Sequence, residues 1–435
     1  SHFSEETFDK DTAAEDLVVY LESDSSGDNT NYANVDIHSS LDMVTWGELE
    51  VTKESDVQVT LQELAPTTAT VQLEYLVSIP DGRNKDYFAV KEHYRLRQGS
   101  ERMYLLDFER KMEQFFFEEQ SSFYGDKIMI GIADSDMELV ESDDGNQLAF
   151  VKSGSLYSCN IVNNSCSRIF SFYDEENWDY RTRNSDHNIR ILNIDETGNV
   201  DFMVYGYMNR GTHEGATGIS LYHYDGVKNT LEESVFIPYD KSYELLAKNV
   251  EKLSFLNHTG ELFLYLEGSI LKVSPVDGGY ERMVEGVTDQ TFKVSADHTM
   301  LVWQTGGEVY ASDEMVMFDL ETGIRSVVKV GKDESVLPLG FMGVDLLYGV
   351  ARREDIVTDA SGEVSFPMYT LHIRDKIGTL LKTYQQEGQY ITGCLLEENM
   401  ITLERMTKLP DGGLVLSTPD TIMNNQPVQG GKNVI

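Results

Sequence analysis

The stretch KVSADHTMLVWQ, residues 293–304, decides the fold because its pattern recurs along the chain. Read alone, the adjacent Asp297 and His298, five residues before Trp303, suggest a catalytic pair. The same order of a polar turn and an apolar strand returns at 141–151, 193–206, 255–267, 340–351 and 394–405. We therefore expect Asp297 to cap its own turn and Trp303 to pack between neighbouring sheets.

A second hairpin follows most copies of this pattern, with turns such as Asp225-Gly226 and Glu321-Thr322-Gly323. Each unit then holds four strands, and the units recur roughly every 40 to 60 residues, close to the period of propeller blades. A four-stranded sheet with two apolar faces must stack on its neighbours. The sequence thus predicts an all-β fold, a β-propeller of four-stranded antiparallel blades, with seven blades favoured over six or eight.

Three regions are expected along the 435 residues. Residues 1–130 are β-rich and are expected to contribute a blade and the ring-closing strand, with DMVTWGELEV (42–51) as the candidate strand. Residues 131–418 hold the blades, and residues 419–435 form a polar tail or linker. A helix is expected at 242–253, and a short polar one near the start of the chain.

Three insertions between second and third strands, at 208–218, 306–314 and 353–368, are the candidate binding loops, because loops on a rigid scaffold often carry function. Arginines stand out on so acidic a chain. The side chains to examine first are Arg210, His213, Glu214, Arg352, Arg353, Asp355, Phe366 and Tyr369.

The net charge of −39, from 74 acidic and 35 basic residues, argues against several partners. Such a surface repels phosphate backbones and anionic headgroups, so we expect the chain not to bind nucleic acid. No run of 18 apolar residues marks a membrane span, so we expect no membrane contact by this fragment. The first residues, SHFSEETFDK, lack a Met and show no signal peptide, so an anchor could precede them.

Two of the three cysteines, Cys159 and Cys166, flank an Asn-rich turn and could form a disulfide, which would imply an oxidising compartment. A loop centred between Val162 and Asn163 places them opposite each other, whereas a turn centred on Asn163-Asn164 offsets them. Cys394 reads as a buried apolar residue.

Part of the chain resembles an uncharacterised protein family of Lachnospiraceae-type Gram-positive gut bacteria. The segments that carry the resemblance are 296–323, 339–356, 366–373 and 400–408. The resemblance is clearest over 289–408 and implies an extracytoplasmic β-rich protein anchored by an N-terminal membrane helix. It implies no activity, catalytic residue or ligand. The units also resemble TolB-like and WD40-like propellers, although the regular Gly-His and Trp-Asp signatures of WD40 repeats are missing.

No strong catalytic signal is present. There is no Gly-x-Ser-x-Gly elbow, and the candidate His213, Glu214 and His223 match no zinc spacing. No cofactor is expected, although the many oxygen donors at 22–31 and 134–146 keep a calcium site as an alternative. The favoured function is a non-catalytic binding scaffold for a protein, peptide or glycan. The alternatives are a glycan-active hydrolase or lyase with acidic channel residues, and a regulatory ectodomain that partners a membrane sensor or cell-wall machine.

Overall fold

A computed structural model describes the chain at residues 2–9, 17–82, 84–116, 123–124, 127–131, 137–173, 181–182, 184–274, 278–306, 308–358, 361–397, 400–409 and 413–423. The chain divides into two compact units. The N-terminal unit runs to Gly215 and includes residues 223–231, and the C-terminal unit comprises residues 216–222 and everything from Glu232. None of the helices in the described ranges is long and apolar enough to cross a membrane.

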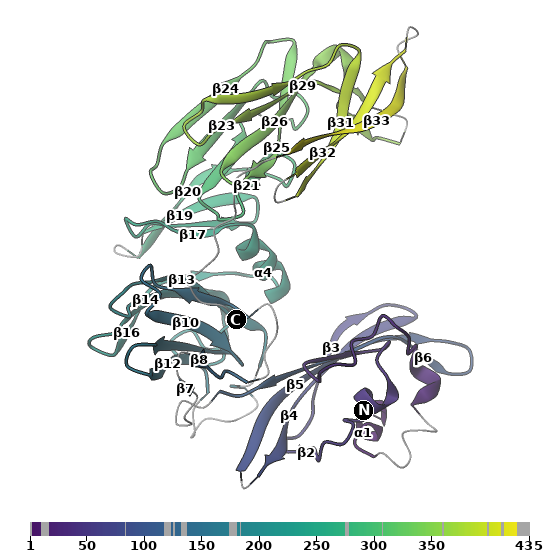
Figure 1. The fold of residues 1–435 in the computed structure, drawn as a ribbon, viewed down its shortest axis with the longest axis vertical. Helices are drawn as coiled ribbons and strands as arrows, with labels where there is room; N and C mark the ends of the chain where they lie inside the picture. Colours follow the sequence, from purple (N-terminus) through teal and green to yellow (C-terminus); the bar gives the residue numbers. More distant parts are fainter. Residues whose placement is uncertain are drawn as a thin grey trace. The chain divides into compact units, whose positions relative to one another are not determined.

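The N-terminal unit begins with a six-stranded sheet built on two unusually long strands (Figure 1). Alternation of buried and exposed side chains along these strands gives the sheet one apolar face. Short helices, α1 (His2–Glu6) and α3 (Leu41–Val44), precede most of it. Its strands are β1 (Asn34–Asp36), β2 (Thr52–Lys53), β3 (Gln58–Leu64), β4 (Thr68–Asp81), β5 (Asn84–Gln98) and β6 (Met103–Gln114).

A buried arginine joins this sheet to α3. Arg110, on β6, donates from Nη1 to the carbonyl of Val44 at 2.8 Å and from Nη2 to that of Met43 at 2.7 Å. These carbonyls lie at the end of a helix, where the Met43 carbonyl also accepts from the Trp46 N–H at 3.3 Å, and the guanidinium caps both of them. Its centre lies 3.6 Å from the ring centroid of Trp46. The buried carboxylate of Glu92, on the neighbouring strand, accepts from the hydroxyls of two tyrosines.

Four-stranded antiparallel sheets follow in both units (Figure 1). Each is a meander of consecutive strands, as the repeated pattern predicts, and the described residues contain four separate sheets of this kind. The first sheet contains β9 (Leu139–Glu141), β10 (Gln147–Lys152), β11 (Ser155–Asn160) and β12 (Ser165–Ser171). The second contains β13 (His187–Ile194), β14 (Val200–Tyr207), β15 (Thr217–Asp225) and β16 (Thr230–Pro238). The third is β17 (Ser254–Leu256), β18 (Leu262–Leu266), β19 (Ser269–Ser274) and β20 (Gly279–Glu285), and the fourth is β21 (Phe292–Val294), β22 (Met300–Gln304), β23 (Glu314–Asp319) and β24 (Arg325–Lys329).

A seven-stranded sheet contains two further meanders. The first of them has four strands and the second has three, and the pair Met368↔Ile391 joins them. The first comprises β25 (Glu334–Met342), β26 (Asp345–Arg352), β29 (Met368–Arg374) and β30 (Leu380–Tyr384). The second comprises β31 (Gln389–Glu397), β32 (Met400–Lys408) and β33 (Leu414–Met423).

Consecutive sheets of the C-terminal unit pack face to face. Strand β22 is buried on both faces. Leu301 and Trp303 share an apolar cluster with Phe263 of the preceding sheet, whereas Val302 clusters with Leu346 of the following sheet. The prediction that Trp303 packs between sheets is confirmed, and so is the stacking that two apolar faces require.

In three of the four-stranded sheets, one polar side chain fastens the turn between the first two strands. Asp297 accepts hydrogen bonds from the Thr299 N–H at 3.1 Å and its hydroxyl at 2.9 Å. Asp195 and Asn257 hold Thr197 and Thr259 in the same way. The prediction that Asp297 caps its own turn is confirmed, and no catalytic reading of it is needed.

Two expectations for the chain ends are wrong. Residues 42–51, expected to be the ring-closing strand, form most of α3 and a turn, because the Ser40 side chain caps the helix by accepting from the Met43 N–H. In the described ranges, β1 to β6 pair only among themselves, so the strands between Asn34 and Gln114 form a separate sheet in place of a further four-stranded blade. The expected tail begins inside β33, and residues 424–435 lie outside the described residues. The count of seven blades and their ring closure stay predictions.

A disulfide joins Cys159 and Cys166 across the β11–β12 hairpin. The two residues pair directly across the ladder, so the loop is centred between Val162 and Asn163, the first of the two geometries considered. Helix α4 (Tyr243–Lys252) lies where the apolar periodicity predicts a helix.

Candidate functional site

All three insertions lie between the second and third strands of their sheets, as predicted. In the C-terminal unit, two of them meet. Arg353, in the 3-10 turn η2 (Arg353–Asp355), donates from Nη2 to the Ala311 carbonyl at 2.7 Å and from Nε to the Glu334 carbonyl at 3.1 Å. The rings of Tyr310 and Phe366 lie 5.5 Å apart. The two loops line an open groove of about 580 Å³.

An arginine, a tyrosine and a glutamate form a cluster beside this groove. The Arg352 guanidinium lies 4.7 Å from the centroid of the Tyr369 ring. The Tyr369 hydroxyl donates to Glu334 Oε1 at 2.5 Å. Burial, followed by that hydrogen bond, raises the pKa of Tyr369 to about 12. The same bond holds the pKa of Glu334 below its ordinary value, so the tyrosine stays neutral and the carboxylate charged at neutral pH.

Two of the expected residues in this region serve the fold. Phe366 is buried in the apolar cluster of the seven-stranded sheet, and its role as a ligand contact stays a prediction. Asp355 accepts from Lys408 Nζ at 2.6 Å and lies 3.9 Å from Arg352 Nη1. Its carboxylate thus neutralises two nearby cations.

The remaining insertion belongs to the N-terminal unit. Glu214 accepts from Arg181 Nη1 at 2.6 Å and lies 3.5 Å from Arg210 Nη1. His213 is half-buried. His223 contacts Asp201 at 2.7 Å, and the described residues contain no group of three His, Cys, Asp or Glu side chains able to hold a metal ion. Part of the second calcium candidate, residues 134–136, lies outside the described residues.

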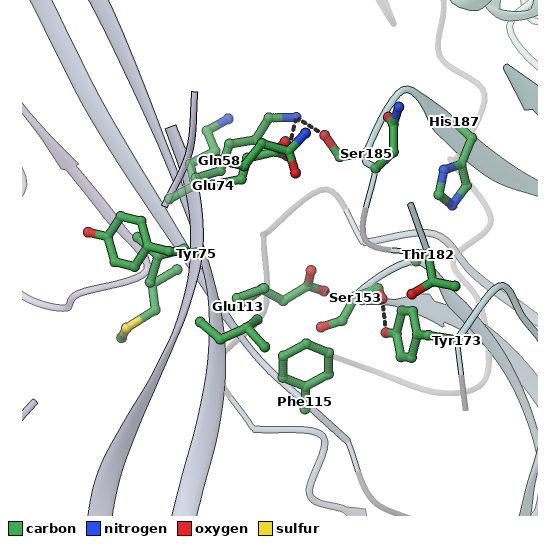
Figure 2. A pocket seen from close by; sticks show the side chains of 18 of the residues that line it. Gln58, Glu74, Tyr75, Glu113, Phe115, Ser153, Tyr173, Thr182, Ser185 and His187 are labelled. Atoms are coloured by element: carbon green, nitrogen blue, oxygen red, sulfur yellow. Dashed lines mark hydrogen bonds and ion pairs between the residues drawn. The ribbon is translucent and has the colours of Figure 1, made fainter. Parts of the chain in front are cut away.

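The N-terminal unit also contains a cavity of about 310 Å³ between its long-stranded sheet and the first two four-stranded sheets (Figure 2). One wall is the face of β4, β5 and β6 that carries Glu74, Ala89 and Glu113. Tyr75, one position on, points to the opposite face in Figure 2, as strand alternation requires. The other wall comes from Ser153, Gly154, Tyr173, Thr182, Asn184, Ser185, His187 and Asn188.

Direct contacts join the two walls. The Ser153 N–H donates to Glu113 Oε1 at 2.9 Å, and Lys91 Nζ donates to the Ser185 hydroxyl at 3.0 Å. The Phe115 and Tyr173 rings meet edge to face at 6.0 Å. The Tyr173 hydroxyl donates to the Ser153 carbonyl, so Ser153 is held on both sides of its backbone (Figure 2).

His187 is a titratable group of the lining whose pKa this environment strongly alters. Burial lowers its pKa to about 4, Lys91 acts in the same direction, and a backbone hydrogen bond at Asn184 opposes them. The ring packs edge to face on Phe172 at 4.8 Å. Its Nδ1 is shielded from solvent and has no hydrogen-bond partner among the described residues. The imidazole is therefore neutral at neutral pH.

Ser153 and His187 do not form a hydrolytic pair. The Ser153 Oγ and the His187 Nδ1 both lack partners in the described part of the chain. The carboxylate that would orient a catalytic histidine is engaged by a backbone N–H instead. A pKa near 4 also makes the imidazole a weak base at neutral pH.

Sequence reasoning missed the cavity altogether. Its walls come from residues 33 to 188, and no local motif joins them. The one local signal is the Ser153-Gly154 turn, in which both residues have positive φ, at 48° and 70°.

No family model matches the chain, and no curated protein matches it. Solved structures do match. The Porphyromonas gingivalis dipeptidyl peptidase 4 is 10% identical over 81% of this chain and 49% of its own, with a TM-score of 0.33, so this chain spans about half of that protein. The β-propeller domain of the trilobed protease from Pyrococcus furiosus is 11% identical over 86% of this chain and 100% of its own, at 0.25. Saccharomyces cerevisiae Sqt1 is 10% identical over 84% and 97%, at 0.26.

Proposed function

We propose that this chain is a non-catalytic binding protein of the propeller type, which holds a protein, peptide or glycan with the loops between its second and third strands. The observation that carries the proposal is the meeting of two such loops at the groove in the C-terminal unit. Stacked sheets supply the rigid support that makes loop positions reproducible.

Two further observations support the proposal. The Ser153 and His187 contacts in the cavity lack the geometry of a hydrolase. The Cys159–Cys166 disulfide is typical of proteins outside the cytoplasm, and on this ground we also propose an extracytoplasmic location for the chain.

The groove is tested with the full chain on a peptide array and a glycan array. Arg353→Ala removes the hydrogen bond that joins the loops, and we expect it to weaken capture of any bound probe by about tenfold, as for a charged hydrogen bond. Arg325→Ala is the matched control, because Arg325 is exposed on β24 away from the groove.

Three results would overturn the proposal. Capture that is equally strong in the Arg353→Ala and wild-type chains would move the site elsewhere. An absence of capture on both arrays would contradict the binding role. The appearance of new reducing ends in a bound glycan would favour the rival glycan-active enzyme.

A further inference from the structure

We propose that the cavity of the N-terminal unit binds a small neutral polyhydroxylated molecule, one or two sugar units in size. The proposal is independent of the groove in the C-terminal unit and of the function proposed for it. It rests on the charge, the unpartnered polar atoms and the size of the cavity.

The cavity is balanced in charge on a chain that is otherwise strongly acidic. Its lining includes two glutamates, Glu74 and Glu113, and two lysines, Lys91 and Lys111. Lys91 lies 3.8 Å from Glu74, and Lys111 lies 3.6 Å from Glu109. Since both cations already face carboxylates, the cavity offers an anion no uncompensated partner, and Glu113 already accepts from the Ser153 N–H.

Two neutral polar atoms of the lining have no partner among the described residues. They are the hydroxyl of Ser153 and the Nδ1 of His187. Buried polar groups in native proteins nearly always find a hydrogen bond, so these two atoms point to a ligand or to ordered water. A neutral hydroxyl group both donates and accepts, and it can therefore satisfy either atom.

The rest of the lining suits a sugar. Thr182, Asn184 and Ser185 add hydroxyl and amide groups on one wall. Leu76 and Ala89 form an apolar patch on the other, where the C–H face of a sugar ring can pack. The volume of about 310 Å³ is at the small end of ligand pockets, which matches one or two rings.

The test is calorimetry and saturation-transfer NMR on the full chain. The neutral probes are glucose, N-acetylglucosamine, maltose and cellobiose. The charged probes are glucosamine, glucuronate and glucose 6-phosphate. We expect at least one neutral probe to bind and its charged relatives to bind more weakly. Binding of no neutral probe, or tighter binding of a charged relative, would overturn the proposal.

Two substitutions locate the site. Ser153→Gly removes the hydroxyl at a positive φ that glycine adopts freely, and Ala89→Leu fills the apolar side of the cavity. We expect the first to weaken binding about threefold to tenfold, the loss of one neutral hydrogen bond, and the second to abolish it.

Asn164→Gly is the matched control for the first substitution. Asn164 also has a positive φ, of 51°, but it is exposed in the hairpin loop and does not line the cavity. If the Ala89→Leu chain binds the sugar as strongly as the wild type, the sugar binds elsewhere and the proposal is wrong. Arg353→Ala should leave sugar binding intact, so failure at the groove and failure at the cavity are distinguishable.

Discussion

Arg110 shows how one side chain can fasten a sheet to a helix. Its guanidinium is fully buried, and burial lowers its pKa, although Tyr75 and Glu92 act in the opposite direction. The charge is tolerated because two carbonyls and the Trp46 ring surround it. A buried charge held in this way costs most when its partners are removed.

Arg110→Met should therefore destabilise the N-terminal unit by about 3 kcal/mol or more, because two carbonyls lose the guanidinium as a donor and Glu92 keeps its buried charge. Urea unfolding followed by tryptophan fluorescence measures the change, since Trp46 lies against the guanidinium. Arg97→Met, at an exposed position of β5, is the control and should change stability by less than about 0.5 kcal/mol. Equal effects of the two substitutions would contradict this account.

His187 predicts a pH dependence whose sign can be stated. Its pKa is about 4 in the folded chain against an ordinary value of 6.5. Between these values the unfolded chain binds the extra proton, so stability falls as the pH drops from 6.5 to 4. At 1.36 kcal/mol per pKa unit the loss is at most about 3 kcal/mol. Thermal melts of wild type and His187→Leu should diverge in this window, and parallel pH profiles would contradict the prediction.

At the residue scale, the sequence predicts side chains whose role is local and misses those whose role is tertiary. Asp297 caps a turn that its own neighbours define, and it was predicted correctly. Phe366 was assigned to a ligand, because a loop position in the sequence does not reveal that the loop folds back on the core. Ser153 and His187 line one cavity only through the packing of three sheets, which no local pattern encodes.

At the element scale, strand period and turn chemistry predict the meanders well. Many of these strands alternate or are fully apolar, and several of the turns contain Asp, Asn or Gly at a position that the backbone requires. The exception is 42–51, where Ser40 and Arg110 stabilise the two ends of a short helix. The second of these residues is 66 positions away from Val44, beyond the reach of a local pattern.

The Cys159–Cys166 bridge should stabilise its hairpin measurably. The cysteines are seven residues apart. Closing this short loop lowers the entropy of the unfolded chain and raises the free energy of unfolding by about 2 kcal/mol. We expect a reductant to lower the melting temperature of the wild-type chain and to leave that of the Cys159→Ala/Cys166→Ala double variant unchanged. Cys394→Ala should respond to reductant as the wild type does. A wild-type chain that is indifferent to reductant would contradict the prediction.

At the scale of the whole molecule, the net charge of −39 weakens the folded state through self-repulsion. Salt screens this repulsion, with a screening length of about 10 Å at 0.1 M. Raising NaCl from low to physiological concentration should therefore raise the melting temperature. Calcium chloride at matched ionic strength is the control, because an extra gain would indicate a specific cation site. A melting temperature that falls with salt would contradict the prediction.

The stacking of sheets in the C-terminal unit also restricts how such a chain can change in length. Strand β22 packs Leu301 and Trp303 against the preceding sheet and Val302 against the following sheet. Losing a single strand would uncover two apolar faces at once, whereas gaining or losing an entire meander leaves every remaining interface of the same kind. Relatives of this protein should therefore differ in length by whole meanders, and smaller insertions should accumulate in the loops between second and third strands.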